Sequence, residues 1–318
     1  MNATTRLTST NYYFEVAATS EESPPLHGAL DRFAQFFIEP LFSPSALDRE
    51  VRVIDSEHNK NLQSDEWRLQ HLDRFLSNPK HLYCHFATGS LQTLETSPKR
   101  NGLDIRSELM QFYEKYYSAN RMKLVVLGQE HFDEIERWVE DLFIGVENKK
   151  LPQNRWEDEL SLRGKDFLTQ CFVELVMALR SLHFQFPFSD EEELIEMLPG
   201  HYISHLIGHE GPGSILSDLR SKGWAINLDA WAFQISPGSP RIFNCQIELI
   251  EDGLKYYQDI VTIFFRYISL LKKTSPQKWI FDKLKFITEI NFKFGGMTSV
   301  DNFTREIILV IQKPLPWQ

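Results

Sequence analysis

Residues 46–61 read ALDREVRVIDSEHNKN, and this stretch, which follows Ser45, can run as one uninterrupted helix. It carries Glu50, Glu57 and His58. On a helix the two carboxylates point within about 20° of each other, but they lie roughly 10 Å apart along the axis. His58 is turned about 100° away from Glu57. Neither neighbour can therefore share a metal ion with Glu57, and at most one of the two glutamates is a direct ligand.

Strand and helix patterns alternate on both sides of this helix. The segment 10–17 is aromatic and β-branched, which is typical of a strand. Apolar residues at helical spacing predict helices over 30–37, ending near Pro40, and over 67–75. The remaining predictions are a helix over 103–120 with Leu109, Phe112, Tyr116 and Tyr117 inward, a buried strand over 122–128 and a helix over 135–143. This order indicates a layered α+β unit.

The chain of 318 residues is long enough for two domains. A polar, proline-bearing stretch over 146–154 is the best linker, so we predict domains over 1–155 and 156–318. The second half repeats the style of the first, with strands over 173–186 and 242–249, a mostly helical segment over 191–209, a turn at 211–213 and an amphipathic helix from Gly253 to Leu271. The predicted fold class is α+β, with two related layered domains, each a mainly antiparallel sheet packed with helices.

The composition narrows the class of protein. Hydrophobic residues make up 42% and charged residues 25%, the balance of a folded globular protein. The net charge of −10 and the lack of a basic stripe argue against nucleic-acid binding and favour a basic peptide partner. Three separated cysteines, Cys84, Cys171 and Cys245, argue against a disulfide framework. Because no stretch approaches about 18 apolar residues and no signal peptide is recognisable, we expect a cytoplasmic protein without a membrane span, with mitochondria as the alternative location.

Histidines at i,i+4 spacing are the other candidate metal ligands. The pairs are His81/His85, His201/His205 and His205/His209. A hydrolytic zinc site of the H-x-x-E-H type also needs a glutamate at the fourth position, and these positions hold Cys84, Ser204 and Gly208. We interpret the first pair as a loop after Pro79 and residues 205–214 as a helix end, a Gly/Pro turn and a new helix capped by Ser214. A structural metal on these pairs is the alternative.

Two other classes of site are weakly supported. The glycines near residue 211 lack the Lys-Ser/Thr of a phosphate loop, and no G-x-S-x-G elbow is present. Nucleotide binding and nucleophilic hydrolysis are therefore poor interpretations.

A set of motifs extends over essentially the whole chain. They are TNYYF at 10–14, GALDRFAQFF at 28–37, DRE at 48–50, DSEHNKN at 55–61, NPKH at 78–81, TLET at 93–96, YYS at 116–118, VVLG at 125–128, PGHY at 199–202, HLIGHEGPGS at 205–214, SKGW at 221–224 and QKPLP at 312–316. Together they resemble the insulinase-type zinc metallopeptidases, the inverzincins.

This resemblance implies a zinc endopeptidase of four related α+β domains that enclose a chamber and cut peptides of modest size. In that family the H-x-x-E-H motif supplies two histidine ligands and the general base. The resemblance assigns Glu57 as the third zinc ligand and Glu50 as a residue that supports the site from outside the direct coordination.

The resemblance also implies two peptide-binding segments. Asn2 and Ala3 match the start of an edge strand on which the family lays out its substrate. The residues His205, Gly208, His209, Gly211 and Leu228 match the region of the second domain that anchors the amino terminus of the substrate. At 228–231 this chain reads LDAW where animal members are glycine-rich, which alters the anchoring backbone.

The family motif H-x-x-E-H would lie upstream of the position that matches Asn2, and this sequence does not contain it. We therefore expect a chain truncated at both ends relative to the family, which does not retain zinc on its own and does not cleave peptides alone. The expected partners are peptide substrates and either the missing domains or a second copy. The alternative is a non-catalytic peptide-binding or scaffold protein.

Overall fold

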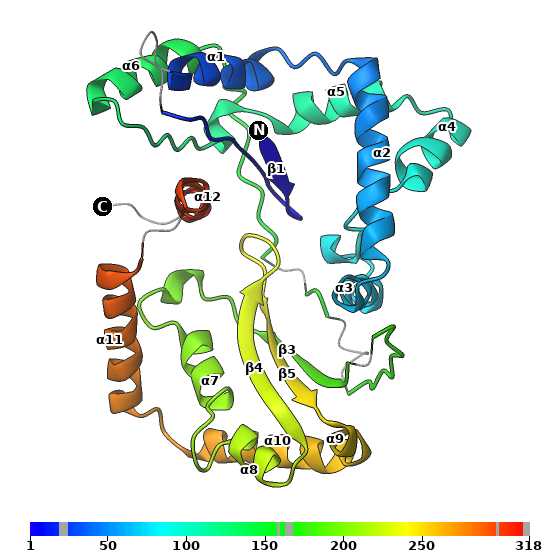
Figure 1. Cartoon of the computed structure of the whole chain (residues 1–318), viewed down its shortest axis with the longest axis vertical. Coiled ribbons are helices and arrows are strands. Elements are labelled where there is room, and N and C mark those ends of the chain that lie inside the picture. Colours follow the sequence, from blue (N-terminus) through cyan, green and yellow to red (C-terminus); the bar gives the residue numbers. More distant parts are fainter. Residues whose placement is uncertain (19–24, 158–159, 163–167, 178, 297–298, 314–318) are drawn as a thin grey trace. The chain divides into compact units, whose positions relative to one another are not determined.

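The computed structural model describes residues 1–18, 25–157, 160–162, 168–177, 179–296 and 299–313 (Figure 1). The chain forms two compact units. The first comprises Met1–Arg68, Phe86–Asn154 and Met297–Gln318, and the second comprises Leu69–His85 and Arg155–Gly296. Packing units and sequence domains are different divisions, so the domains over 1–155 and 156–318 remain a prediction.

The first unit contains a small hairpin and several helices. Strands β1 (Asn2–Thr5) and β2 (Thr10–Tyr13) pair antiparallel, with Asn2 opposite Tyr13. The helices are α1 (Pro25–Ile38), α2 (Pro44–Asn61), the first residues of α3 (Asp65–Leu76), α4 (Ser97–Arg100), α5 (Ile105–Tyr116), α6 (Phe132–Phe143) and α12 (Val300–Ile311). Two successive tyrosines of β2 connect this hairpin to helices.

Alternation along β2 explains these contacts, because neighbouring side chains of a strand point to opposite faces. The ring of Tyr12 lies 5.5 Å from that of Phe37 on α1, and its hydroxyl lies 2.6 Å from that of Tyr117. Tyr13 instead receives the guanidinium of Arg305, on α12, 4.5 Å from its ring centroid. The late helix α12 is thus part of the first unit.

The second unit is a three-stranded antiparallel sheet with helices. Its strands are β3 (Ser181–Phe188), β4 (Ala225–Gln234) and β5 (Arg241–Leu249), in the order β3-β5-β4. The helices are the part of α3 from Leu69 onward, α7 (Pro199–Ile207), α8 (Ile215–Ser221), α9 (Glu251–Lys255), α10 (Tyr257–Lys273) and α11 (Lys278–Phe294). None of the helices in the described residues is both long and apolar enough to cross a membrane.

One face of this sheet forms the core of the second unit. Row by row across the strands, Phe184 lies opposite Cys245, which lies opposite Ala230. The ring of Phe264, on α10, is fully buried and stacks on Phe184 at 4.1 Å. Helices α7 and α8 complete the cluster with Ile207, Ile215, Leu216 and Leu219. Burial of these apolar side chains is the main stabilising contribution.

The predicted α+β class with antiparallel sheets is confirmed, although the sheet described in the first unit is only the β1–β2 hairpin. The helix predicted over 46–61 is α2, and those predicted over 30–37, 67–75 and 135–143 are α1, α3 and α6. Ser214 caps α8 as predicted, because its side chain accepts the Ser217 N–H at 3.1 Å.

Other predictions were wrong. Residues 122–128 are not a strand, because no strand in the described residues pairs with them, and Leu124 and Leu127 are 37% and 45% exposed. On α5, Phe112 and Tyr116 are exposed rather than inward. Three segment boundaries also differ: β3 begins only at Ser181, residues 195–198 are not helical, and the helix expected from Gly253 is divided into α9 and α10. The motif residues 314–316 lie outside the described residues.

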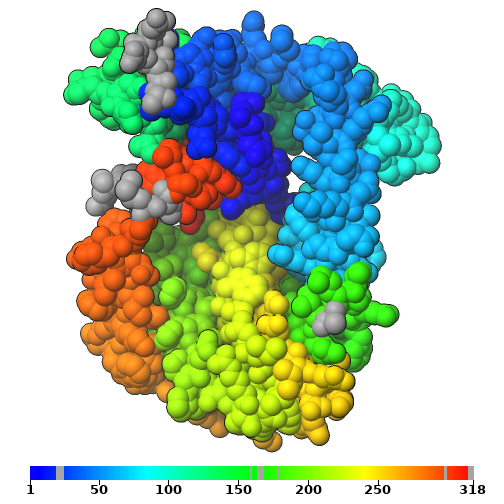
Figure 2. Space-filling view, in the orientation of Figure 1, coloured from blue at the N-terminus to red at the C-terminus, as the bar shows by residue number. Residues whose placement is uncertain are grey.

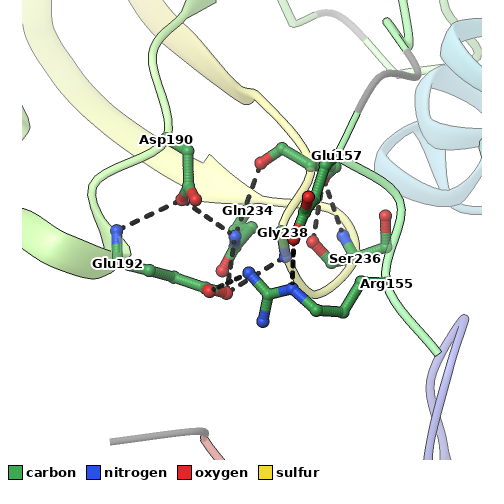
Figure 3. A network of polar contacts seen from close by, with 8 residues as sticks. Arg155, Glu157, Asp190, Glu192, Gln234, Ser236 and Gly238 are labelled. Atoms are coloured by element: carbon green, nitrogen blue, oxygen red, sulfur yellow. Dashed lines mark hydrogen bonds and ion pairs between the residues drawn. The ribbon is translucent and has the colours of Figure 1, made fainter. Parts of the chain in front are cut away.

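A polar network holds the loop between β4 and β5 (Figure 3). Arg155 donates to Glu192 at 2.7 Å and to Glu157 at 2.6 Å. Glu192 also accepts the Gly238 N–H and the Gln234 side chain, each at 3.1 Å. Burial by itself raises the pKa of Glu192, but the hydrogen bonds from Arg155, Gly238 and Gln234 outweigh it and hold the pKa below its ordinary value.

This pKa shift predicts a stability change with pH. A carboxyl with a depressed pKa in the folded state stabilises the fold above its unfolded pKa and loses this contribution as the pH falls through the folded value. We expect Glu192→Gln to lower the free energy of unfolding by about 2 kcal/mol at pH 7. The difference from the parent chain should shrink as the pH drops below about 4.3, the ordinary pKa of glutamate.

Urea unfolding of both proteins at several pH values measures this effect. Glu193→Gln is the control, because Glu193 is exposed next to Glu192. A loss of stability that is the same at every pH would contradict the prediction.

Candidate functional site

Helix α2 divides its side chains between two faces. Asp55 accepts the Leu91 N–H at 2.7 Å and the Asn59 side chain at 3.1 Å. His58 Nδ1 lies 3.0 Å from Thr88 Oγ1, and the His58 ring meets Phe86 edge-on at 5.3 Å. One face of the helix therefore binds the segment 86–91 of the same unit.

The other face of α2 carries Glu50 and Glu57, both exposed. Glu57 lines an open surface depression together with Arg52, Val53, Ser56 and Lys60. These side chains recur at helical spacing and form one stripe. Val53 is 49% exposed, so an apolar side chain lies beside the carboxylates. In the described residues Glu57 makes no hydrogen bond or ion pair with its own chain, and its carboxylate is available to an external group.

The described residues do not form a zinc site by themselves. A catalytic zinc takes about three protein ligands and a water. In the described ranges no group of three or more His, Cys, Asp or Glu side chains is placed to hold a metal. Glu57 can supply one oxygen ligand, but one carboxylate cannot hold a catalytic zinc.

The histidine pairs have different surroundings. His81 is buried and accepts the Tyr83 N–H at 3.0 Å, at the start of a short 3₁₀ turn, Leu82–Cys84, so the pair with His85 is not on an α-helix. His205 lies on α7, and its ring is 5.8 Å from that of His209. Burial lowers the pKa of His205, and the charges of Lys283, His209 and His201 lower it further.

The structure brings the predicted anchoring residues to one end of α7. Gly208 ends this helix and donates its N–H to the Ser204 carbonyl at 2.8 Å. A Cβ on Gly208 would lie 3.8 Å from the Leu228 carbonyl oxygen and 3.9 Å from the Ala230 nitrogen. In the described residues β4 pairs with β5 alone and is therefore at the edge of its sheet, with one side free of a partner strand. Peptide chains bind to such edges by strand addition.

The turn after α7 is also fixed by glycine. A Cβ on Gly211 would lie 2.8 Å from His209 Nε2, so only glycine lets the His209 ring occupy its place. Gly213 has a φ of +84°, which a residue with a side chain rarely adopts. His205, Gly208, His209 and Gly211 are thus held in one compact turn beside β4.

Asn2 and Ala3 lie on β1, in the first unit. This strand pairs only with β2 in the described residues, and its residues are largely exposed. The Asn2 side chain accepts the Ala3 N–H at 2.9 Å. The other edge of β1 can therefore pair with an extended peptide.

Sequence reasoning missed Asp55 as the residue that fixes α2, and it did not identify β4 from its pattern. Alternation over 225–234, with Leu228 buried and Asp229 and Trp231 exposed, is the signal that indicates this strand. No local signal links Asp55 to the distant Leu91 N–H.

Comparison with known proteins identifies the family to which this chain belongs. The peptidase M16 inactive domain matches residues 104–287, and the insulinase domain of peptidase family M16 matches residues 1–80. The chain belongs to the insulinase-type peptidases of family M16. Zinc is the metal of the intact family.

Individual relatives support this assignment. The A-factor-processing enzyme of Saccharomyces cerevisiae is 42% identical over 98% of this chain and 30% of its own length. The insulin-degrading enzyme of Homo sapiens is 41% identical over 96% of this chain and 29% of its own. The crystal structure of pitrilysin superposes with a TM-score of 0.79 and 24% identity, over 91% of this chain and 30% of that one. The chain thus spans about 30% of the length of these relatives.

The two faces of α2 lead to a prediction. We expect Asp55→Ala to lower the free energy of unfolding by about 1–2 kcal/mol, because it removes a charged acceptor from the Leu91 N–H. Glu57→Ala also removes a carboxylate from the same helix but should change the free energy of unfolding by no more than about 0.5 kcal/mol. Urea denaturation of the two variants measures both values, and an equal loss would show that Glu57 has a role in the fold.

Proposed function

We propose that this chain provides the carboxylate zinc ligand and the peptide-anchoring surfaces of an insulinase-type zinc metalloendopeptidase. The exposed Glu57 is the observation that carries the proposal. Its neighbours Asp55 and His58 fix α2 to its own unit, whereas Glu57 is exposed and makes no hydrogen bond or ion pair in the part of the chain that the structure describes. In this proposal Glu57 is one direct ligand, and Glu50, about two turns away, supports the site from outside the coordination sphere.

Zinc in such a site acts as a Lewis acid and activates water. The two histidine ligands and the general base would come from an H-x-x-E-H segment, which these 318 residues do not contain. We therefore expect the chain alone neither to retain catalytic zinc nor to hydrolyse peptides. Its proposed partners are peptide substrates and the remaining domains of a longer protein or a second copy, and the proposed compartment is the cytoplasm.

Peptide binding itself is proposed for two strand edges. One is β1 with Asn2 and Ala3, and the other is β4 near Leu228, beside the turn of His205, Gly208, His209 and Gly211. An extended peptide would pair with exposed backbone groups there, which requires no metal. A peptide-binding protein without catalysis is the second candidate, and the Gly208–β4 geometry favours it as much as the first.

Sequencing the 5′ end of the transcript separates the two candidates. An in-frame H-x-x-E-H upstream of Met1 would support the peptidase, and its absence would support the non-catalytic protein.

One prediction from this proposed function concerns the turnover of peptides by the chain alone. With excess zinc, the purified chain should not cleave a fluorogenic peptide above background, because one carboxylate cannot bind and activate the zinc-bound water. Turnover that is abolished both by a chelator and by Glu57→Gln would contradict this expectation.

Another prediction from this proposed function concerns the binding of a peptide at β4. Gly208→Val should weaken the binding of a fluorescent peptide by about ten-fold or more, because the new side chain would cover the Leu228 and Ala230 backbone groups. Gly28→Val is the control, since nothing lies within 4 Å of a Cβ at that position. Fluorescence anisotropy measures both affinities. Equal affinities for the two variants would argue against the β4 edge as the binding site.

A further inference from the structure

The sheet of the second unit has a second face that differs from its core face. Alternate residues of each strand point to opposite faces, and the core face carries Phe184, Cys245 and Ala230. We call the side chains of β4 and β5 on the other face the open face. Its members are Asn227, Asp229, Trp231 and Phe233 of β4 and Ile242, Asn244, Gln246 and Glu248 of β5. Ile242 is buried, whereas Asp229, Trp231 and Glu248 are exposed. Figure 2 shows the chain around β4, in yellow, at the surface of the second unit.

The open face is negatively charged. Asp229 and Glu248 are both exposed, and in the described residues neither makes an ion pair. Asp229 accepts a hydrogen bond from Asn227 Nδ2 at 2.7 Å, which orients its carboxylate without neutralising it. Glu248, on β5, lies opposite Asn227, whereas Asp229 lies opposite Gln246. Glu248 is therefore the diagonal neighbour of Asp229 on the same face of the sheet. These two positions are near enough for one cation to interact with both carboxylates.

An aromatic side chain completes the pattern. Trp231 is 40% exposed and lies two residues beyond Asp229 on the same face of the strand. The separation is about 7 Å, the same as that between alternate side chains of an extended peptide. A peptide lying along β4 would thus place the side chain of its residue i at the carboxylates and the side chain of residue i+2 on the indole ring.

We propose that the open face binds an extended peptide segment that carries lysine or arginine. The cationic group lies between Asp229 and Glu248, and an apolar or cationic side chain two residues away packs on Trp231. Charge complementarity selects this occupant, since the whole chain carries a net charge of −10. This inference rests on the proposed peptide-binding function and adds a preference for basic segments to it.

The size of the expected preference for a cationic side chain follows from the exposure of the Asp229 and Glu248 carboxylates. An exposed ion pair contributes little, but two carboxylates around one cation beside an aromatic ring should favour binding by about ten-fold over a neutral side chain. Because the carboxylates are exposed, this preference should weaken as the salt concentration rises. Binding through backbone hydrogen bonds at the strand edge alone would show neither a preference for a cationic side chain nor a dependence on salt concentration.

The test uses fluorescence anisotropy with the full chain and two labelled peptides. The peptides share the same apolar residues and differ only in having lysine or glutamine at alternate positions. We expect the lysine peptide to bind about ten-fold more tightly at low salt. The double variant Asp229→Asn/Glu248→Gln should bind both peptides equally.

A matched control has the same change in charge elsewhere in the second unit. Asp259→Asn/Glu289→Gln alters two exposed carboxylates on α10 and α11 and should keep the preference for lysine. Thermal unfolding confirms that each variant is folded. Equal affinities of the parent chain for the two peptides, or the same loss of preference in the control, would overturn the inference. If neither peptide binds, the proposed peptide-binding function itself fails.

Discussion

The second unit depends on the stacking of one buried ring, Phe264, against the sheet. Phe264 is fully buried, and its ring is nearly parallel to Phe184 at 4.1 Å and to Phe186 at 6.1 Å. The row that begins at Phe184 continues with two small side chains, Cys245 and Ala230, which leave room for the aromatic rings. Because a strand alternates strictly, a shift of one residue in any strand would turn that strand's apolar set outward, and such a shift in β3 would remove Phe184 and Phe186 from Phe264. The register of the sheet and the position of α10 are therefore specified together.

This register also determines which groups the sheet presents to other molecules. With Ala230 and Ala232 on the core face, α7 can approach closely, since a Cβ on its Gly200 would lie only 3.1 Å from that of Ala232. The buried Glu191 fixes the same helix: it accepts the Gly200 N–H and pairs with Arg241 at 3.1 Å. The close approach of α7 brings Gly208 beside the backbone of β4. Core packing thus positions both the edge proposed for peptide binding and the charged face that alternates with the core.

The sequence predicted the parts that have a local cause. The helix over 46–61 has a long uninterrupted pattern, and Ser214 is a recognisable cap, so both were found correctly. The segment 122–128 has the composition of a buried strand, but a strand needs a hydrogen-bonded neighbour, and that requirement is not local. Helix α12 contacts the first unit through Arg305, which reaches Tyr13 nearly 300 residues earlier, and no spacing rule reveals this contact. Likewise the proposed site residues were named from motifs, whereas the proximity of Gly208 to Leu228 follows from tertiary packing.

Helix α2 illustrates how neighbouring residues acquire opposite roles. Asp55, Glu57 and His58 are almost adjacent in sequence, yet a helix turns about 100° per residue and separates them. Asp55 and His58, three residues apart, share a face and are engaged by the segment 86–91. Glu57 is turned away from that face, so the contacts that hold the helix in place do not occupy its carboxylate. A metal ligand needs this combination, because its backbone must be rigid while its oxygens remain free. The contacts of Asp55 and His58 are therefore what would make Glu57 useful as a ligand, and they provide this whether or not the remaining ligands are present.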